Sequence, residues 1–118
     1  MTWFIKAHPK YNSNKTVVNG KEFDSKKEAK RYVELVNLER AGLIKDLEMQ
    51  KPYELQPAFK KNGKSYRPII YFADFVYINT QTKQTVVEDV KGFKTEVYKV
   101  KKKLFEYKYP DLTIVEVS

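Results

Sequence analysis

The run IIYFADFVYI, residues 69–78, constrains the fold of this chain more than any other segment. Its β-branched and aromatic residues predict a strand, and that strand is apolar on both faces except for Asp74. A carboxylate within such a run is costly to bury unless it is paired or binds a cation. The groups that lie beside Asp74 therefore decide how the segment is to be interpreted.

A first helix is predicted between Ser25 and Gly42. Ser25 followed by Glu28 is a capping box, and Gly42 ends the helix as its C′ residue. Apolar residues recur at helical spacing and form the expected buried stripe: Ala29, Tyr32, Val33 and Val36.

A second helix is predicted over residues 96–109, with Thr95 as its N-cap and Pro110 as its stop. Its expected core stripe is Val97, Val100, Leu104 and Tyr107.

Strand patterns occupy the remaining segments. Asn62-Gly63 predicts a hairpin between residues 53–59 and 65–78, and residues 79–84 form the turn into a strand over 85–91. Residues 112–117 form a closing strand, and Asn19-Gly20 predicts a short ribbon near the N-terminus. The order is helix, three antiparallel strands, helix, strand. It predicts an α+β domain over residues 17–118 with a mixed sheet, preceded by a basic arm over residues 1–16.

Net charge points to a polyanionic partner. The 118 residues carry a formal charge of +8, and lysine supplies all but three of the 23 basic residues. A lysine-rich surface suits phosphate contact more than base reading, although ordinary solubility is the simpler interpretation. The chain has no cysteine, no apolar run long enough for a membrane helix and no export signal, so we expect a cytoplasmic protein.

The candidate catalytic residues lie on the two predicted strands that flank the turn at residues 79–84. Asp74 and Asp89 lie on either side of it at similar distance, and Lys91 faces the same way as Asp89. Two carboxylates suit Mg²⁺ or Mn²⁺, and a neighbouring lysine orients water or offsets phosphate charge. This set predicts phosphodiester hydrolysis. The alternative is a solvated Asp89–Lys91 pair, with Asp74 satisfying a nearby backbone donor.

The segments FADF and EDVKG, following a helix with a glutamate, resemble the PD-(D/E)XK nuclease superfamily, and within it a group of small phage-encoded proteins. The resemblance implies a restriction-endonuclease-like αβββαβ core and a metal-dependent endodeoxyribonuclease. By this resemblance Asp74 and Asp89 are catalytic metal ligands, Lys91 is the catalytic lysine, and the main-chain carbonyl of Val90 joins the metal. Ala73 stands where the motif name has proline.

Two glutamates have competing roles. Glu28 matches a first-helix acid that many superfamily members place at the metal, where it is catalytic, yet its offset from Ser25 is that of a capping box. Glu88 faces away from Asp89 and has either a solvated or a supporting role.

DNA is the expected partner, contacted through its backbone. The candidates are lysines on or just before the second helix, two lysines of the arm and one glutamine: Lys94, Lys99, Lys101, Lys102, Lys103, Lys10, Lys15 and Gln56. On the alternative interpretation the helix lysines form a solvated face and Gln56 is a surface amide of the first strand. Few arginines argue against base-specific readout and favour recognition of DNA shape or backbone. By analogy with small basic members of the superfamily, the resemblance implies branched DNA such as a Holliday junction as the substrate and a homodimer as the assembly. A non-cleaving nucleic-acid-binding module and a partner-activated subunit of a phage replication or packaging complex remain as alternatives.

Overall fold

The computed structural model describes residues 16–118, so the arm residues Lys10 and Lys15 lie outside the described part. Thr16, assigned to the arm by sequence, already belongs to the first strand. The elements in chain order are β1 (Thr16–Val18), β2 (Lys21–Phe23), α1 (Lys26–Arg40), β3 (Ile44–Gln56), β4 (Phe59–Lys61), β5 (Lys64–Tyr66), β6 (Ile69–Asn79), β7 (Thr85–Val90), α2 (Glu96–Lys108) and β8 (Ile114–Val117). Within these residues neither helix is long and apolar enough to cross a membrane.

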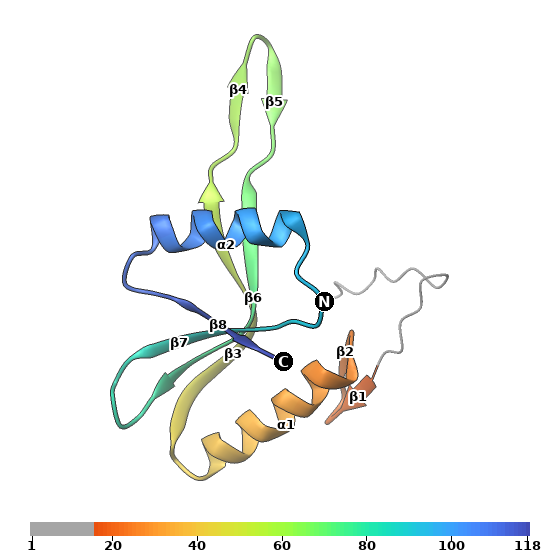
Figure 1. The fold of residues 1–118 in the computed structure, drawn as a ribbon, viewed down its shortest axis with the longest axis vertical. Helices are drawn as coiled ribbons and strands as arrows, with labels where there is room; N and C mark the ends of the chain where they lie inside the picture. Colours follow the sequence, from red (N-terminus) through yellow and green to blue (C-terminus); the bar gives the residue numbers. More distant parts are fainter. Residues whose placement is uncertain (1–15) are drawn as a thin grey trace.

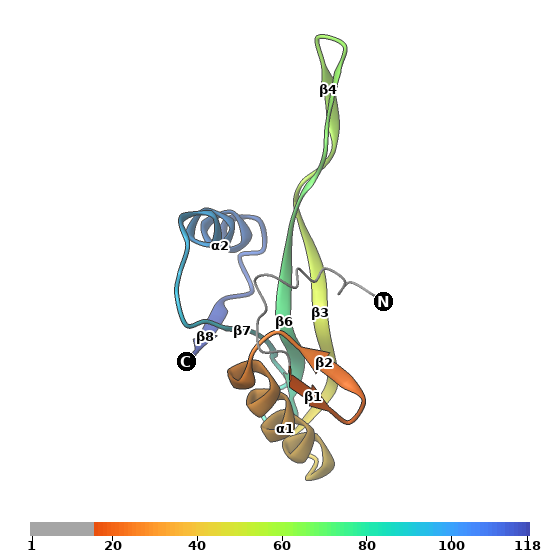
Figure 2. The same ribbon diagram turned by 90° about the vertical axis from the view of Figure 1, so that its right-hand side faces the viewer.

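The central sheet has the strand order β3-β6-β7-β8 (Figure 1). β3, β6 and β7 pair antiparallel, and β8 returns parallel to β7 after the crossover through α2. The predicted α+β class with a mixed sheet is confirmed. Two short hairpins, β1–β2 and β4–β5, are added to the predicted core order, and β4–β5 extends well beyond the rest of the molecule in both views (Figures 1 and 2).

Both Asn-Gly dipeptides form the predicted hairpin turns. Asn19 and Gly20 have φ of +52° and +77°, and Asn62 and Gly63 have +53° and +75°, the left-handed values that a two-residue hairpin turn requires. Pro52 lies within β3, an edge strand of the sheet, where a missing N–H is tolerated.

The core consists of two clusters, one under each helix. Tyr98 and Phe105 of α2 pack with residues of β3, β6, β7 and β8, among them Tyr53 and Tyr71. The second cluster joins α1 to the other end of the β3–β6 pair: Phe23, Ala29, Tyr32, Leu35, Ile44, Phe75 and Tyr77.

The buried stripe of α1 is shifted from its predicted position. Ala29 and Tyr32 are buried as expected and Val36 is partly buried. Val33, however, is 40% exposed, whereas Leu35, not predicted, is fully buried.

The core stripe predicted for α2 is wrong. Its members are exposed, with Val97 at 64% and Tyr107 at 87%; Val100 and Leu104 are also exposed. The helix instead buries Tyr98 and Phe105. The ring of Phe105 packs edge-on against Tyr53 and Tyr71 of the sheet, and the Tyr53 and Phe105 ring centroids lie 5.0 Å apart. Aromatic rings bury more area than valines and gain from edge-to-face packing, so the aromatic face is turned to the sheet.

Candidate functional site

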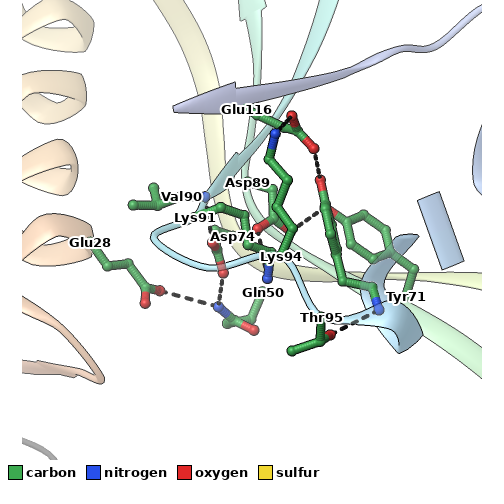
Figure 3. A network of polar contacts seen from close by, with 11 residues as sticks. Glu28, Gln50, Tyr71, Asp74, Asp89, Val90, Lys91, Lys94, Thr95 and Glu116 are labelled. Atoms are coloured by element: carbon green, nitrogen blue, oxygen red, sulfur yellow. Dashed lines mark hydrogen bonds and ion pairs between the residues drawn. The ribbon is translucent and has the colours of Figure 1, made fainter. Parts of the chain in front are cut away.

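Asp74 and Asp89 meet where the β6–β7 ladder ends. The last pair of that ladder is Phe75 with Glu88, so the next facing positions are those of the two aspartates. Asp74 Oδ2 accepts a hydrogen bond from the Val90 N–H at 2.8 Å, which takes the place of a ladder bond (Figure 3). The structure thus brings the two predicted acids together from neighbouring strands.

Asp89 is the most buried of the candidate acids, with 2% exposure. Its Oδ2 accepts a hydrogen bond from the Tyr71 hydroxyl at 2.6 Å. Its Oδ1 lies 3.1 Å from Lys91 Nζ, but within residues 16–118 it accepts no hydrogen bond. The geometry of the lysine is therefore that of an ion pair, and one buried oxygen of Asp89 keeps unused acceptor capacity.

Lys91 lies between a carboxylate and an aromatic ring. Its Nζ contacts Asp89 on one side and stands 4.3 Å from the ring centroid of Tyr98 on the other. The ring face attracts the ammonium group electrostatically. Asp89 and Tyr98 together hold the amine at the acidic site, as the two-residue spacing in β7 predicted.

Gln50 is part of the site, although the sequence did not indicate it. It faces Asp74 across the β3–β6 ladder, because the flanking pairs are Met49 with Phe75 and Lys51 with Ala73. Its Nε2 donates to Asp74 Oδ1 at 3.0 Å and to Glu28 Oε2 at 3.3 Å (Figure 3). Its φ of +52° is a strained value for a non-glycine residue within a strand.

Glu28 takes part in both expected interactions, through its backbone at the helix cap and through its side chain at the acidic site. Its N–H donates to Ser25 Oγ at 3.1 Å, which is half of the predicted capping box. Its carboxylate accepts the Gln50 amide instead of closing the box. Burial, reinforced by the charges of Asp74, Asp24 and Asp89, raises its pKa to about 8.

The pKa of Asp74 is raised as well, to about 6. Burial is the main cause and the charge of Asp89 is the next, while the hydrogen bonds from Val90 and Gln50 oppose the rise. Three carboxylates of like charge therefore share a partly desolvated region, where one positive side chain, Lys91, contacts one of them.

A divalent cation fits this set of donors. Carboxylate and carbonyl oxygens are the ligands that Mg²⁺ and Mn²⁺ prefer, and the unused Oδ1 of Asp89 is one of them. Asp74, Asp89 and the Val90 carbonyl are the groups that would hold the ion. In residues 16–118 no three Asp, Glu, His or Cys side chains are arranged to hold one ion together. Glu28 would join them if the amide of Gln50, which lies between it and Asp74, moved away.

Glu88 does not have the solvated role that was one of its two predicted alternatives. It is 1% exposed and accepts two hydrogen bonds from Arg31, from Nε at 2.8 Å and from Nη2 at 2.6 Å. The Tyr77 hydroxyl donates to it as well. A buried carboxylate needs such partners, and this one joins β7 to α1.

Most of the lysines predicted to contact DNA have partners within the chain. Lys94 pairs with Glu116, Lys99 with Glu96 and Lys102 with Glu106. Lys101 Nζ donates to the Ile70 carbonyl at 3.0 Å, which turns it towards β6, while Lys103 is exposed.

Gln56 lies apart from the acids. It is exposed at the end of β3, six residues beyond Gln50, or roughly 20 Å along an extended strand. It stands at the base of the β4–β5 hairpin instead of beside the carboxylates.

Comparison with known proteins identifies the family. Residues 8–117 match the family described as "Protein of unknown function (DUF1064)". No curated protein and no solved structure matches the chain. Because the match covers nearly the whole sequence, the chain belongs to the DUF1064 family.

Proposed function

We propose that this chain is a Mg²⁺- or Mn²⁺-dependent DNA endonuclease of the PD-(D/E)XK type. The observation that carries the proposal is the meeting of Asp74 with Asp89 at the end of the β6–β7 ladder, with Lys91 ion-paired to Asp89 on the same face. Buried like charges are costly, so a site that gathers them without a function is not expected.

The reaction is hydrolysis of a phosphodiester bond. The oxygen of a water molecule joins phosphorus, the bond from phosphorus to one sugar oxygen breaks, and that oxygen takes up a proton. When bound, the metal ion stabilises charge on the phosphate and makes its bound water more acidic. Asp74 and Asp89 would hold it, and Tyr71 fixes the orientation of the Asp89 carboxylate through its hydroxyl.

Lys91 supplies positive charge at the phosphate. Its amine is held by Asp89 and by the ring of Tyr98, so it is placed before substrate arrives. A preplaced ammonium group offsets the charge that develops on the phosphate without further reorganisation. The role of Glu28 is to complete the acidic site once Gln50 releases it.

Branched DNA is the proposed substrate. With three arginines in the whole chain, bidentate reading of bases has little support, whereas contact with the backbone and its shape needs only lysines. A Holliday junction or another branch is a choice made by analogy within the superfamily. Such a substrate places the protein in the cytoplasm, that of a bacterial host if the gene is carried by a phage or prophage.

A homodimer is the proposed assembly. The exposed apolar side chains of α2 are arranged symmetrically about position 102, so that Val97 corresponds to Tyr107 and Val100 to Leu104 in an antiparallel pair of helices. An isologous contact between two copies requires this self-complementarity. Sedimentation analysis of the purified protein and of Leu104→Lys tests it: the wild type is expected as a dimer and the variant as a monomer.

A cleavage assay tests the proposed function. Four-way junction, flap, duplex and single-stranded DNA are incubated with the protein and Mg²⁺ or Mn²⁺, with EDTA as the control. Asp89→Asn should abolish cleavage while DNA binding is retained. Asp46→Asn is the matched control, because Asp46 is exposed on β3 and its φ of +57° suits asparagine.

Three outcomes separate the alternatives. Cleavage that depends on metal and on Asp89 supports the endonuclease. DNA binding with all four substrates intact in either metal contradicts it and favours a non-cleaving module. Cleavage that appears only when proteins encoded beside this one are added indicates a partner-activated subunit.

A further inference from the structure

The β4–β5 hairpin is an isolated projection of the fold. It extends away from the sheet and both helices in the two perpendicular views (Figures 1 and 2), and every residue from 57 to 68 is exposed. Neither core cluster includes any of these residues. Nothing in the folding of the domain body therefore accounts for its length or its composition.

Its charge is of one sign. Residues 57–68 carry four basic side chains, Lys60, Lys61, Lys64 and Arg67, and no acidic one. Lys61 and Lys64 face each other directly across the two-residue turn. Like charges at facing positions destabilise a hairpin, and none of the ion pairs within residues 16–118 includes these four side chains.

An aromatic pair lies on the same face of the ribbon as this lysine pair. Phe59 and Tyr66 face each other, with ring centroids 4.6 Å apart and planes inclined by 9°. Each lies two positions from a lysine of the facing pair, so the rings and both amines point the same way. Lys64 Nζ stands 5.2 Å from the Tyr66 ring, and both aromatic residues remain 40% exposed.

The stability of the hairpin itself explains the stacked aromatic pair but not the facing lysine pair. A stacked cross-strand pair stabilises a two-stranded ribbon that would otherwise be marginal. The facing lysines act in the opposite direction, and a carboxylate at either position would have relieved the repulsion. A partner that brings negative charge to both amines accounts for the facing lysines.

We propose that the β4–β5 hairpin is a duplex-DNA-binding ribbon. Lys61 and Lys64 contact phosphates on the two sides of a groove, and the exposed edges of Phe59 and Tyr66 pack against the sugars. A two-stranded ribbon fits the major groove, which is about 12 Å wide. The choice of DNA rests on the proposed function; the requirement for a polyanion rests on the hairpin itself.

The distance to the candidate catalytic site agrees with one continuous duplex. Tyr66 precedes Asp74 by eight residues, which is at most about 27 Å along an extended strand. One turn of duplex is about 34 Å long, so the ribbon reaches DNA no more than about 8 base pairs from the point of cleavage. Cleavage should therefore require a duplex arm on one side of the scissile bond, and an arm of about 8 base pairs should be long enough.

Equilibrium binding tests the ribbon without cleavage. The probe is a fluorescent duplex of about 30 base pairs in EDTA, measured by anisotropy over a range of salt concentrations. The variant Lys61→Ala/Lys64→Ala should bind about 10-fold more weakly at low salt, and its log–log salt dependence should become shallower by about 2. Its melting temperature should be unchanged or higher, because the facing charges are removed.

A double variant at the other end of the β3–β6 pair serves as the control. Lys45→Ala/Lys83→Asn removes the same charge; Lys45 is exposed there, and asparagine tolerates the φ of +66° at Lys83. Unchanged duplex binding by Lys61→Ala/Lys64→Ala, or an equal loss in the control, overturns the inference. A loss confined to single-stranded DNA of the same length also overturns the groove assignment.

The ribbon inference and the proposed endonuclease function can be contradicted independently of each other. If the wild type cleaves DNA but Lys61→Ala/Lys64→Ala binds and cleaves as well as the wild type, the ribbon inference is wrong and the proposed function stands. If no DNA is cleaved with either metal while binding depends on Lys61 and Lys64, the proposed function is wrong and the ribbon stands.

Discussion

Arg31 and Glu88 form a two-fold hydrogen-bonded ion pair between α1 and β7, with N–O distances of 2.8 and 2.6 Å. The pair is placed immediately beside the candidate site. Arg31 follows Glu28 by about one turn of α1, and Glu88 precedes Asp89 in β7. The helix that carries one candidate acid is thereby fixed to the strand that carries another.

Arg31→Met should therefore lower the free energy of unfolding by about 3–5 kcal/mol, because it leaves the carboxylate of Glu88 buried without its cation. Urea denaturation measures the change. Glu34→Gln, which removes the exposed partner of Arg31, should cost less than about 1 kcal/mol. A similar small loss for both variants would show that the buried pair does not fix α1.

Tyr71→Phe should weaken metal binding while keeping the fold. The hydroxyl of Tyr71 orients the Asp89 carboxylate, and the loss of such a supporting hydrogen bond typically lowers metal affinity about 10–100-fold. Calorimetric titration with Mn²⁺ gives the affinity. Tyr98→Phe is the control, since its hydroxyl bonds Glu116 and its ring remains beside Lys91. Equal losses in the two variants would contradict the role of Tyr71.

Local signals predicted the framework of the fold. The Asn-Gly turns, the Ser25 and Thr95 caps and the tight turn after β6 depend on a few neighbouring residues, so they can be recognised in one sequence. The facing of Asp74 and Asp89 followed from counting outward from that turn. Each of these features is decided within a few residues of the chain.

Features set by packing could not be predicted in this way. The chain offers two apolar faces on α2, and only the aromatic partners in the sheet decide that Tyr98 and Phe105 are buried. The residue of β3 that faces Asp74 depends on an irregularity in the strand pairing. Counting outward from the Asn62-Gly63 turn predicts that Asp74 faces Lys51. The register shift between Glu54 and Gln56 places Gln50 opposite Asp74 instead. Likewise, the burial of Glu88 depends on Arg31, 57 residues away.

Gln50 provides a test of strain at the site. Gln50→Gly should be more stable than Gln50→Ala by about 1 kcal/mol, because only glycine adopts a φ of +52° without cost. Both variants lose the amide that bonds Glu28, so both should raise the pKa of Glu28 above its value of about 8. Denaturant unfolding gives the first quantity and NMR titration of the carboxyl carbon gives the second. Equal stability of the two variants would show that the backbone there is not strained.

The acidic cluster should make stability depend on pH and on metal. Burial raises the pKa of Asp74 from 3.8 to about 6 and that of Glu28 from 4.5 to about 8. Between about pH 4 and about pH 8 the folded chain therefore binds more protons than the unfolded chain. The contribution of both groups to stability is therefore fully present below about pH 4 and is lost as the pH rises to about 8.

Melting temperatures in EDTA across this range should fall less with pH in Glu28→Gln and Asp74→Asn than in the wild type, because an amide does not ionise. Mg²⁺ should raise the melting temperature of the wild type near pH 8 and have little effect near pH 5, where protons occupy the carboxylates. Glu106→Gln, which removes an acid of α2 that pairs with Lys102, should follow the wild-type response. A metal effect of equal size at both pH values, or one that persists in Asp74→Asn, would show that the ion binds elsewhere.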